Sequence, residues 1–194
     1  TDVIRVSYES PKTPNRTYEY NVATKEKKLI KELEIPSGYN RDEYIVKRLN
    51  CEAHDGRKIP ITITYHKDTK LDGSANLLLY GYGSYGHTIS PSFSTTRLSL
   101  INRNIIWATA HIRGGMEKGM KYWEEGKMLN KKNTFKDYIS CAKYLIDQKY
   151  TDKGKIIGYG GSAGGLLMGA VVNEAPELFL GMIMAVPFVD SLTT

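Results

Sequence analysis

Residues 156–168 read Ile-Ile-Gly-Tyr-Gly-Gly-Ser-Ala-Gly-Gly-Leu-Leu-Met, an apolar run, a glycine-rich turn and a second apolar run. This pattern predicts a strand that turns sharply into a helix, with Ser162 at the turn. Glycines are expected two positions to either side, at Gly160 and Gly164, because a Cβ there would collide where strand and helix approach. Such a turn exposes the Ser162 hydroxyl and aims the Ala163 N–H at the position of an oxyanion.

Two other interpretations of these residues stay open. One is a turn of small residues with no chemistry. The other is a dinucleotide-binding turn, because Gly158-x-Gly160-x-x-Ala163 matches the fingerprint Gly-x-Gly-x-x-Gly/Ala and Asp190 could serve as the ribose acid. Asp190 lies later than the usual spacing of about 20 residues, and Pro187 interrupts its strand. The nucleophile turn is therefore favoured.

Length and composition place the chain among globular proteins. Its 194 residues can bury one good core, and 41% hydrophobic and 10% aromatic residues are ordinary for a folded domain. The net charge of +6 comes from 27 basic and 21 acidic residues that are mixed along the chain. Because they form no basic stripe, no nucleic acid partner is expected.

The cysteines and the apolar runs indicate the cellular location of the protein. Cys51 and Cys141 lie far apart with no metal-ligand spacing, which predicts reduced thiols in a cytoplasmic protein. The longest nearly unbroken apolar stretch, residues 178–189, is about 12 residues long and too short to span a bilayer. No secretory leader is expected. We therefore expect no metal held by the cysteines and no membrane partner.

Residues 1–40 have a β texture. Residues 3–8 and 16–21 alternate apolar and polar side chains, with turn-forming residues at 11–15, so two or three antiparallel strands are predicted. So few strands rarely stand alone in water, which favours the remnant of a larger β structure or a hairpin packed on the rest of the chain. Residues 35–40 mark the predicted boundary.

The rest of the chain alternates strands and helices. Strands are predicted at 44–49, 59–65, 76–80, 105–110, 156–159 and 182–186. A helix is predicted at 134–148, with Thr134 and Asp137 as a capping pair, and a second helix follows Ser162. This alternation predicts a mostly parallel sheet covered on both faces. Together with the turn, it predicts a partial α/β-hydrolase fold.

A serine hydroxyl becomes a good nucleophile when a base accepts its proton, and in this fold an Asp or Glu and then a His follow the serine. The histidines His54, His66, His87 and His111 all precede Ser162. His87 and His111 are weak candidates for the base. Asp190 is suitably placed at a strand end, yet it has no histidine to orient. The site is expected to be incomplete within these residues.

The loop after the 76–80 strand is glycine-rich, and Gly81-x-Gly83-x-x-Gly86 superficially matches the dinucleotide fingerprint. No helix is predicted after it. The hydrolase interpretation makes this loop the source of a second oxyanion donor, and a plain Gly/Tyr turn remains the alternative.

Several segments together resemble the prolyl oligopeptidase family. They are LYGYGSYG at 79–86, HIRGG at 111–115, residues 123–138, GGSAGGLLMGA at 160–170, and APELF at 175–179 with VPFVD at 186–190. The resemblance covers nearly the whole chain. It implies that residues 1–40 are the last strands of a truncated β-propeller and that residues 41–194 are the amino-terminal portion of an α/β-hydrolase catalytic domain.

The resemblance also implies an activity. Ser162 would be acylated, the Ala163 N–H and the Tyr82 hydroxyl would form the oxyanion hole, and Arg113 would anchor a nearby loop. Short peptides would be the substrates, with a preference for cleavage after Lys or Arg in one branch of the family, and no cofactor is implied. The triad Asp and His would lie beyond Thr194 or on a complementary chain. The isolated chain would then be inactive, and a non-catalytic remnant or a peptide-binding fragment is the alternative.

Overall fold

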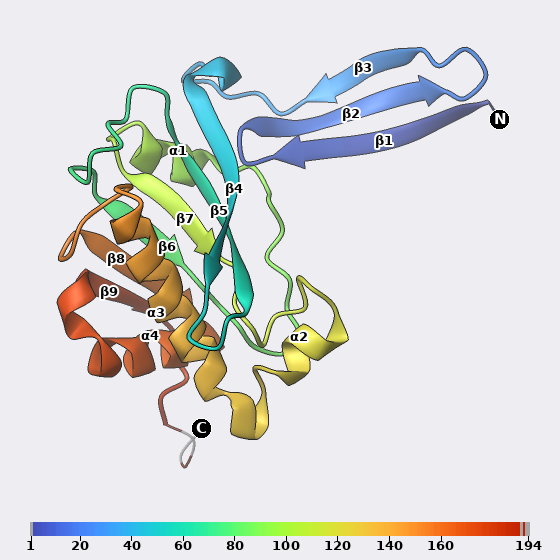
Figure 1. Ribbon diagram of the computed structural model, residues 1–194. Helices are drawn as coiled ribbons and strands as arrows, with labels where there is room; N and C mark the ends of the chain where they lie inside the picture. The colour runs from blue at the N-terminus through green and yellow to red at the C-terminus, as the bar shows by residue number, and fades with distance from the viewer. Residues whose placement is uncertain (1, 191, 193–194) are drawn as a thin grey trace.

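A computed structural model describes residues 2–190 and 192. Its first part is a three-stranded antiparallel sheet in the order β1-β2-β3, with β1 at Val3–Ser10, β2 at Thr13–Asn21 and β3 at Lys27–Glu32. This sheet extends away from the rest of the molecule and carries the N-terminus at its far tip (Figure 1). Only residues 11–12 form the first turn, because β2 already begins at Thr13, inside the segment that was predicted as turn.

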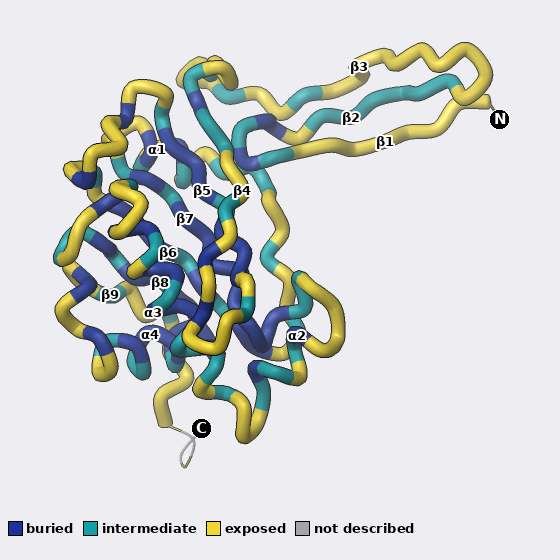
Figure 2. Tube along the Cα trace, viewed as in Figure 1, coloured by how far each residue is buried: buried dark blue, intermediate teal, exposed yellow. Residues whose placement is uncertain are grey.

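Apolar side chains of this small sheet lie in solvent. Val6, Tyr8 and Leu29 are 43%, 53% and 46% exposed, and most of β1 and β3 is exposed along its length (Figure 2). A sheet that buries so little apolar surface is not stable by itself. The predicted remnant of a larger β structure therefore agrees with this part of the fold. The predicted boundary after residue 40 falls just before a one-turn helix, and it stays a prediction.

The second sheet has six strands in the order β4-β5-β7-β6-β8-β9. Their bounds are β4 Tyr44–Glu52, β5 Lys58–His66, β6 Leu77–Tyr80, β7 Ile106–Ala110, β8 Ile156–Gly161 and β9 Phe179–Ala185. The β4-β5 and β5-β7 pairs are antiparallel, and the three remaining pairs are parallel. This is the partial α/β-hydrolase fold that the sequence predicts.

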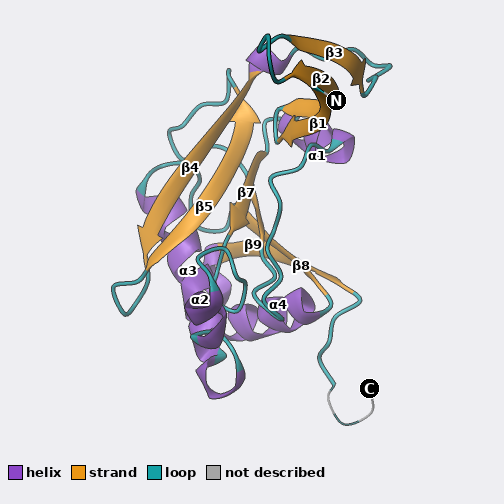
Figure 3. Cartoon of the chain, turned by 90° about the vertical axis from the view of Figure 1, so that its right-hand side faces the viewer, coloured by secondary structure: helices purple, strands orange, loops and turns teal. Residues whose placement is uncertain are grey.

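Helices cover the two faces unequally. On one face, α3 (Lys132–Asp147) packs on β4 and β5, and α4 (Ala163–Glu174) packs on β8, β9 and α3 (Figure 3). On the other face, α1 (Thr95–Ile101) packs on β5 and β7. Successive residues of a strand point to opposite faces. Ala108 of β7 accordingly lies in the main core, and the adjacent Trp107 packs with the α1 cluster.

The remaining elements are short. They are α2 at Met120–Glu124 and three one-turn 3-10 helices at Arg41–Glu43, Met128–Asn130 and Pro176–Leu178. Helices α1 and α2 were not predicted, because five to seven residues are too few for a clear helical period. No helix within the described ranges has both the length and the apolar character to cross a membrane.

The predicted capping pair is wrong. Helix α3 begins at Lys132, and no side chain caps it. Thr134 and Asp137 are instead fully buried, and both bond the segment that carries Arg113. A threonine and an aspartate occupy these positions because the buried backbone N–H and carbonyl of Arg113 need hydrogen-bond partners.

The two cysteines are neighbours in space. Cys51 of β4 and Cys141 of α3 are both buried free thiols, and their sulfur atoms lie 3.4 Å apart. Their separation by 90 residues concealed this contact, which follows from the packing of α3 on β4.

Candidate active site

Ser162 stands alone between β8 and α4 in a strained conformation, with φ 54° and ψ −117°. Its N–H donates to the Ala185 carbonyl at 2.9 Å, and its carbonyl accepts the N–H groups of Gly165 at 2.9 Å and Phe188 at 3.0 Å. A non-glycine residue keeps such a backbone only where its surroundings hold it. The residue itself is exposed, so the turn presents the hydroxyl to solvent as predicted.

The glycines around this turn are required by close backbone contacts. A Cβ on Gly160 would lie 2.2 Å from the Gly164 carbonyl oxygen, and one on Gly164 would lie 2.8 Å from the Gly81 carbonyl oxygen. The steric reason given for both positions is therefore confirmed. Gly158 is different, because side chains fill its surroundings: its Cβ would meet the sulfur atoms of Met182 and Met168. A pyrophosphate would find no open approach there.

A pair of glycine substitutions tests this packing. We expect Gly160→Ala to destabilise the protein by about 2 kcal/mol, because a backbone atom has to move. Gly161→Ala is the matched control, since its Cβ would meet nothing closer than 3.4 Å. Urea unfolding of both variants measures the difference. Equal stabilities would show that the strand and helix are free to separate at this turn.

Tyr82 lies in the loop between β6 and α1, next to the serine turn. The loop is fixed at its ends by the Gly81 N–H, which donates to the Tyr159 carbonyl at 3.0 Å, and by the Gly86 N–H, which donates to the Gly114 carbonyl at 2.9 Å. A Cβ on Gly164 would lie 3.5 Å from Cδ2 of Tyr82. The tyrosine ring therefore packs against the first turn of α4, close to Ser162 and Ala163.

A pocket of about 470 Å³ opens beside these residues. Its lining is Ser84, Tyr85, Gly114, Trp123, Gly126, Lys127, Met128, Lys131, Ala163, Leu166 and Phe188. The pocket therefore joins the Tyr82 loop, the region around α2 and the start of α4. Its walls combine aromatic rings with two amines and include no carboxylate.

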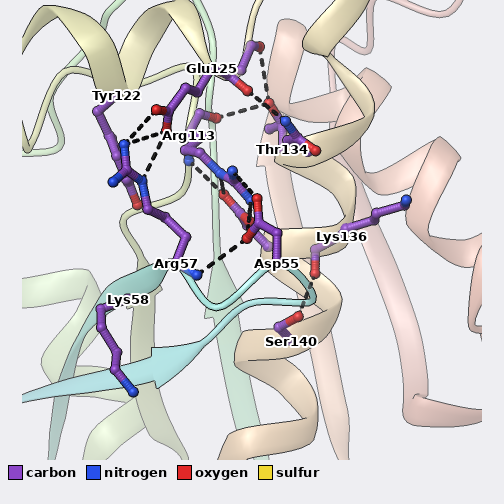
Figure 4. A network of polar contacts seen from close by, with 12 residues as sticks. Asp55, Arg57, Lys58, Arg113, Tyr122, Glu125, Thr134, Lys136 and Ser140 are labelled. Atoms are coloured by element: carbon purple, nitrogen blue, oxygen red, sulfur yellow. Dashed lines mark hydrogen bonds and ion pairs between the residues drawn. The ribbon is translucent and has the colours of Figure 1, made fainter.

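Arg113 anchors residues 111–115 through a network of polar contacts (Figure 4). Its guanidinium is 2% exposed and donates to the carboxylates of Asp137, at 2.8 and 2.6 Å, and Asp55, at 2.6 and 3.2 Å. The Arg113 N–H also donates to Asp137, and its carbonyl accepts the Thr134 hydroxyl at 2.8 Å. The guanidinium holds the pKa of the Asp55 carboxyl below its usual value. This agrees with the anchoring role that the resemblance implies.

The segment that Arg113 holds is packed directly under the Tyr82 loop. A Cβ on Gly114 would lie 2.1 Å from the Gly83 carbonyl oxygen, and one on Gly83 would lie 2.4 Å from the Thr134 methyl group. Displacement of residues 111–115 would therefore be transmitted to Tyr82.

The histidines do not converge on the serine. His111 is 3% exposed, and its Nε2 pairs with the Thr62 hydroxyl at 2.8 Å. His87 is exposed, and its ring meets the Tyr82 ring edge-on, with centroids 5.2 Å apart. In the part of the chain that the structure describes, no hydrogen bond joins a histidine to Ser162. Asp190, the candidate orienting acid, accepts the Leu192 N–H at 2.9 Å.

Known proteins resemble this chain closely. Residues 91–194 match the sequence profile of the Prolyl oligopeptidase family. Over the full chain, Dipeptidyl aminopeptidase BI of Pseudoxanthomonas mexicana is 47% identical and Protease 2 of Moraxella lacunata is 45% identical. The solved structure of oligopeptidase B from Trypanosoma brucei with covalently bound antipain matches 98% of this chain, with a TM-score of 0.90 and 40% identity.

The chain spans 27%, 28% and 27% of the lengths of these three proteins, in that order. The predicted likeness to oligopeptidase B, also called protease II, is thus found in sequence and in structure. From the profile match over residues 91–194, the full-length similarity of these relatives and the shared fold, the chain belongs to the prolyl oligopeptidase family.

Proposed function

We propose that this chain is part of a serine peptidase that hydrolyses short peptides through an acyl-enzyme on Ser162. One observation carries the proposal: an exposed serine on a strained strand-to-helix turn, with the Tyr82 ring packed against the helix after that turn. Family membership supports the same reaction class.

In the proposed reaction, Ser162 Oγ forms a bond to the carbonyl carbon of the peptide and gives its proton to a base. The carbonyl oxygen becomes an oxyanion that accepts hydrogen bonds from the Ala163 N–H and the Tyr82 hydroxyl. The tetrahedral intermediate then breaks its C–N bond, and the leaving amine takes the proton from the base. Water hydrolyses the remaining ester on Ser162 by the same steps.

We infer that the base is a histidine outside these 194 residues, together with its orienting carboxylate. The burial of His111 against Thr62 and the exposure of His87 support this inference. The two groups would come from the same polypeptide or from a complementary chain. Residues 1–194 alone would then react at least about 10⁴-fold more slowly than the complete site, since triad members act as a unit.

The substrate side chain is proposed to enter the pocket beside Ala163, where Tyr85 and Phe188 offer apolar surface. Cleavage after Lys or Arg follows from the resemblance to oligopeptidase B. The carboxylates that such a preference needs are not among the residues that line this pocket, so they are proposed to lie outside this chain. The cytoplasmic location remains a prediction from the cysteines.

The test uses the full-length gene product. A fluorophosphonate probe should label it, and peptide mapping should place the label on Ser162. Short chromogenic peptides ending in Arg should be cleaved, with larger proteins cleaved far more slowly. Absence of label together with absence of hydrolysis would contradict the proposal and favour a non-catalytic remnant. Labelling of residues 1–194 at the full-length rate would contradict the external base.

A further inference from the structure

We propose that Lys131 is a positioning residue for the oxyanion hole: its protonated amine holds the middle of the Tyr82 loop so that the Tyr82 hydroxyl meets the developing charge. The inference rests on the proposed function and names a further residue of the same site. Three observations support it. The amine bonds the Tyr82 loop, its position is unfavourable for a cation, and among the described residues no carboxylate forms an ion pair with it.

The amine bonds the loop directly beside Tyr82. Lys131 Nζ donates to the Gly83 carbonyl at 2.6 Å and to the Ser84 hydroxyl at 2.7 Å. Backbone hydrogen bonds hold the loop at Gly81 and Gly86, and Lys131 adds a side-chain attachment between these two ends. Without the Lys131 amine, the carbonyl of Gly83, directly after Tyr82, would lose the hydrogen bond that it accepts from a side chain.

The position is unfavourable for a cation. Lys131 is the N-cap residue of α3, where the helix dipole is positive and repels a positive charge. Its side chain lies against the pocket wall, and within the described ranges no carboxylate forms an ion pair with it. Burial lowers the pKa of its amine to about 8. Local features that work against stability are expected at functional sites.

The neighbouring lysines show what is particular to Lys131. Lys127 lines the same pocket, yet its amine lies over the Trp123 ring, 3.5 Å from the centroid. Lys132 begins the same helix and is exposed. Only Lys131 of these three donates to the Tyr82 loop. Lys132 is therefore a matched control for charge and for helix position.

The experiment measures kcat and KM for a short peptide with the full-length gene product. We expect Lys131→Met to lower kcat by about 10- to 100-fold and to change KM by less than about threefold, since an oxyanion donor acts in the transition state. Lys132→Met should keep both constants within about twofold. Lys131→Cys alkylated with 2-bromoethylamine should recover most of kcat, with the alkylated unmodified sequence as its control.

The pH profile separates a positioning role from a merely structural one. As pH rises through about 8, deprotonation of Lys131 should lower kcat, and Lys131→Met should lack this alkaline limb. Among the described residues, the other titratable groups near this site are Tyr85 and Lys127 of the pocket lining, and Tyr82 and His87, whose rings contact each other. They are unchanged in the variant, so a limb that persists would belong to them and would overturn the inference.

Two further variants keep the outcomes distinct. Tyr82→Phe should lower kcat by about 10²- to 10³-fold, the usual loss for an oxyanion-hole donor. If Tyr82→Phe has its effect while Lys131→Met resembles Lys132→Met, the inference about Lys131 is wrong and the proposed function stands. If Tyr82→Phe and Ser162→Ala both leave kcat unchanged, the proposed function itself fails, and this inference fails with it.

Discussion

Replacing Ser162 by alanine is expected to lower kcat for short peptides by about 10⁶-fold, the loss found when a triad serine is removed. The physical reason is that no other group at the turn can form the acyl bond. Ala163 is 4% exposed, and its contribution is a backbone N–H. Steady-state hydrolysis and fluorophosphonate labelling of the full-length gene product measure the effect. Residual activity above about one part in 10³ would assign the nucleophile to another residue.

The backbone strain at position 162 should also be measurable as a difference in stability between two inactive variants. Ser162 has φ 54° and ψ −117°, where a Cβ is strained and glycine is not. We therefore expect Ser162→Gly to be inactive and more stable than Ser162→Ala by about 1 kcal/mol. Alanine is the matched control because it removes the hydroxyl and keeps the Cβ. Equal stabilities would mean that the turn carries no strain.

Local patterns predicted most of the fold. The turn at Ser162 could be recognised because glycines stand at 160 and 164, where the backbone of the strand and of the helix come too close for a Cβ. The strands were recognised because buried parallel strands are continuous apolar runs, as in residues 77–79. Their ends were misplaced by up to three residues, since charged residues such as Glu52 and Lys58 extend the β4-β5 pair past its apolar part.

The site could be predicted only in part. The closeness of Tyr82 to the serine turn came from the resemblance, because nothing in a Gly/Tyr loop says which helix it will touch. Lys131 was missed altogether. Its acceptors are a backbone carbonyl at Gly83 and a hydroxyl at Ser84, 48 and 47 residues away, and neither leaves a signal in the sequence.

Buried pairs were also beyond local reasoning. Asp137 has the spacing of a capping residue, and its partner Arg113 stands 24 residues earlier. The contact of Cys51 with Cys141 spans 90 residues. Such contacts depend on how α3 lies on the sheet, and that orientation is a property of the whole core. Resemblance to a family supplied an anchoring role for Arg113 without supplying its partners.

The largest loss of stability is expected from Asp137→Ala, at about 3–5 kcal/mol, the range found when one partner of a buried pair is removed. Asp137 is 0% exposed and accepts three hydrogen bonds from Arg113, through Nε, Nη2 and the backbone N–H. The Arg113 side chain is itself 2% exposed and, among the described residues, would keep only Asp55 as an ion-pair partner. Urea unfolding of the full-length gene product measures the change.

A second ion pair in the same network provides the control. Arg57 and Glu125 form a comparable fork, in which Nε lies 2.9 Å from Oε2 and Nη2 lies 2.6 Å from Oε2 and 2.5 Å from Oε1. Their side chains are 40% and 26% exposed. Glu125→Ala should therefore cost at most about 1 kcal/mol, because water can replace the lost contacts. Similar losses in Asp137→Ala and Glu125→Ala would show that burial does not set the strength of these pairs.

The double variant Arg113→Met with Asp137→Leu then separates charge from packing. If the loss in Asp137→Ala comes mainly from an unpaired buried guanidinium, replacing both partners by apolar side chains should recover more than half of it. Activity should not recover with it, because the backbone N–H of residue 113 would lose its Asp137 acceptor. The segment packed under Gly83 would then keep the Thr134 hydroxyl on the carbonyl of residue 113 but would lose the carboxylate that fixes the neighbouring N–H. Recovery of stability without recovery of kcat would show that this buried pair serves the position of Tyr82 more than it serves the fold.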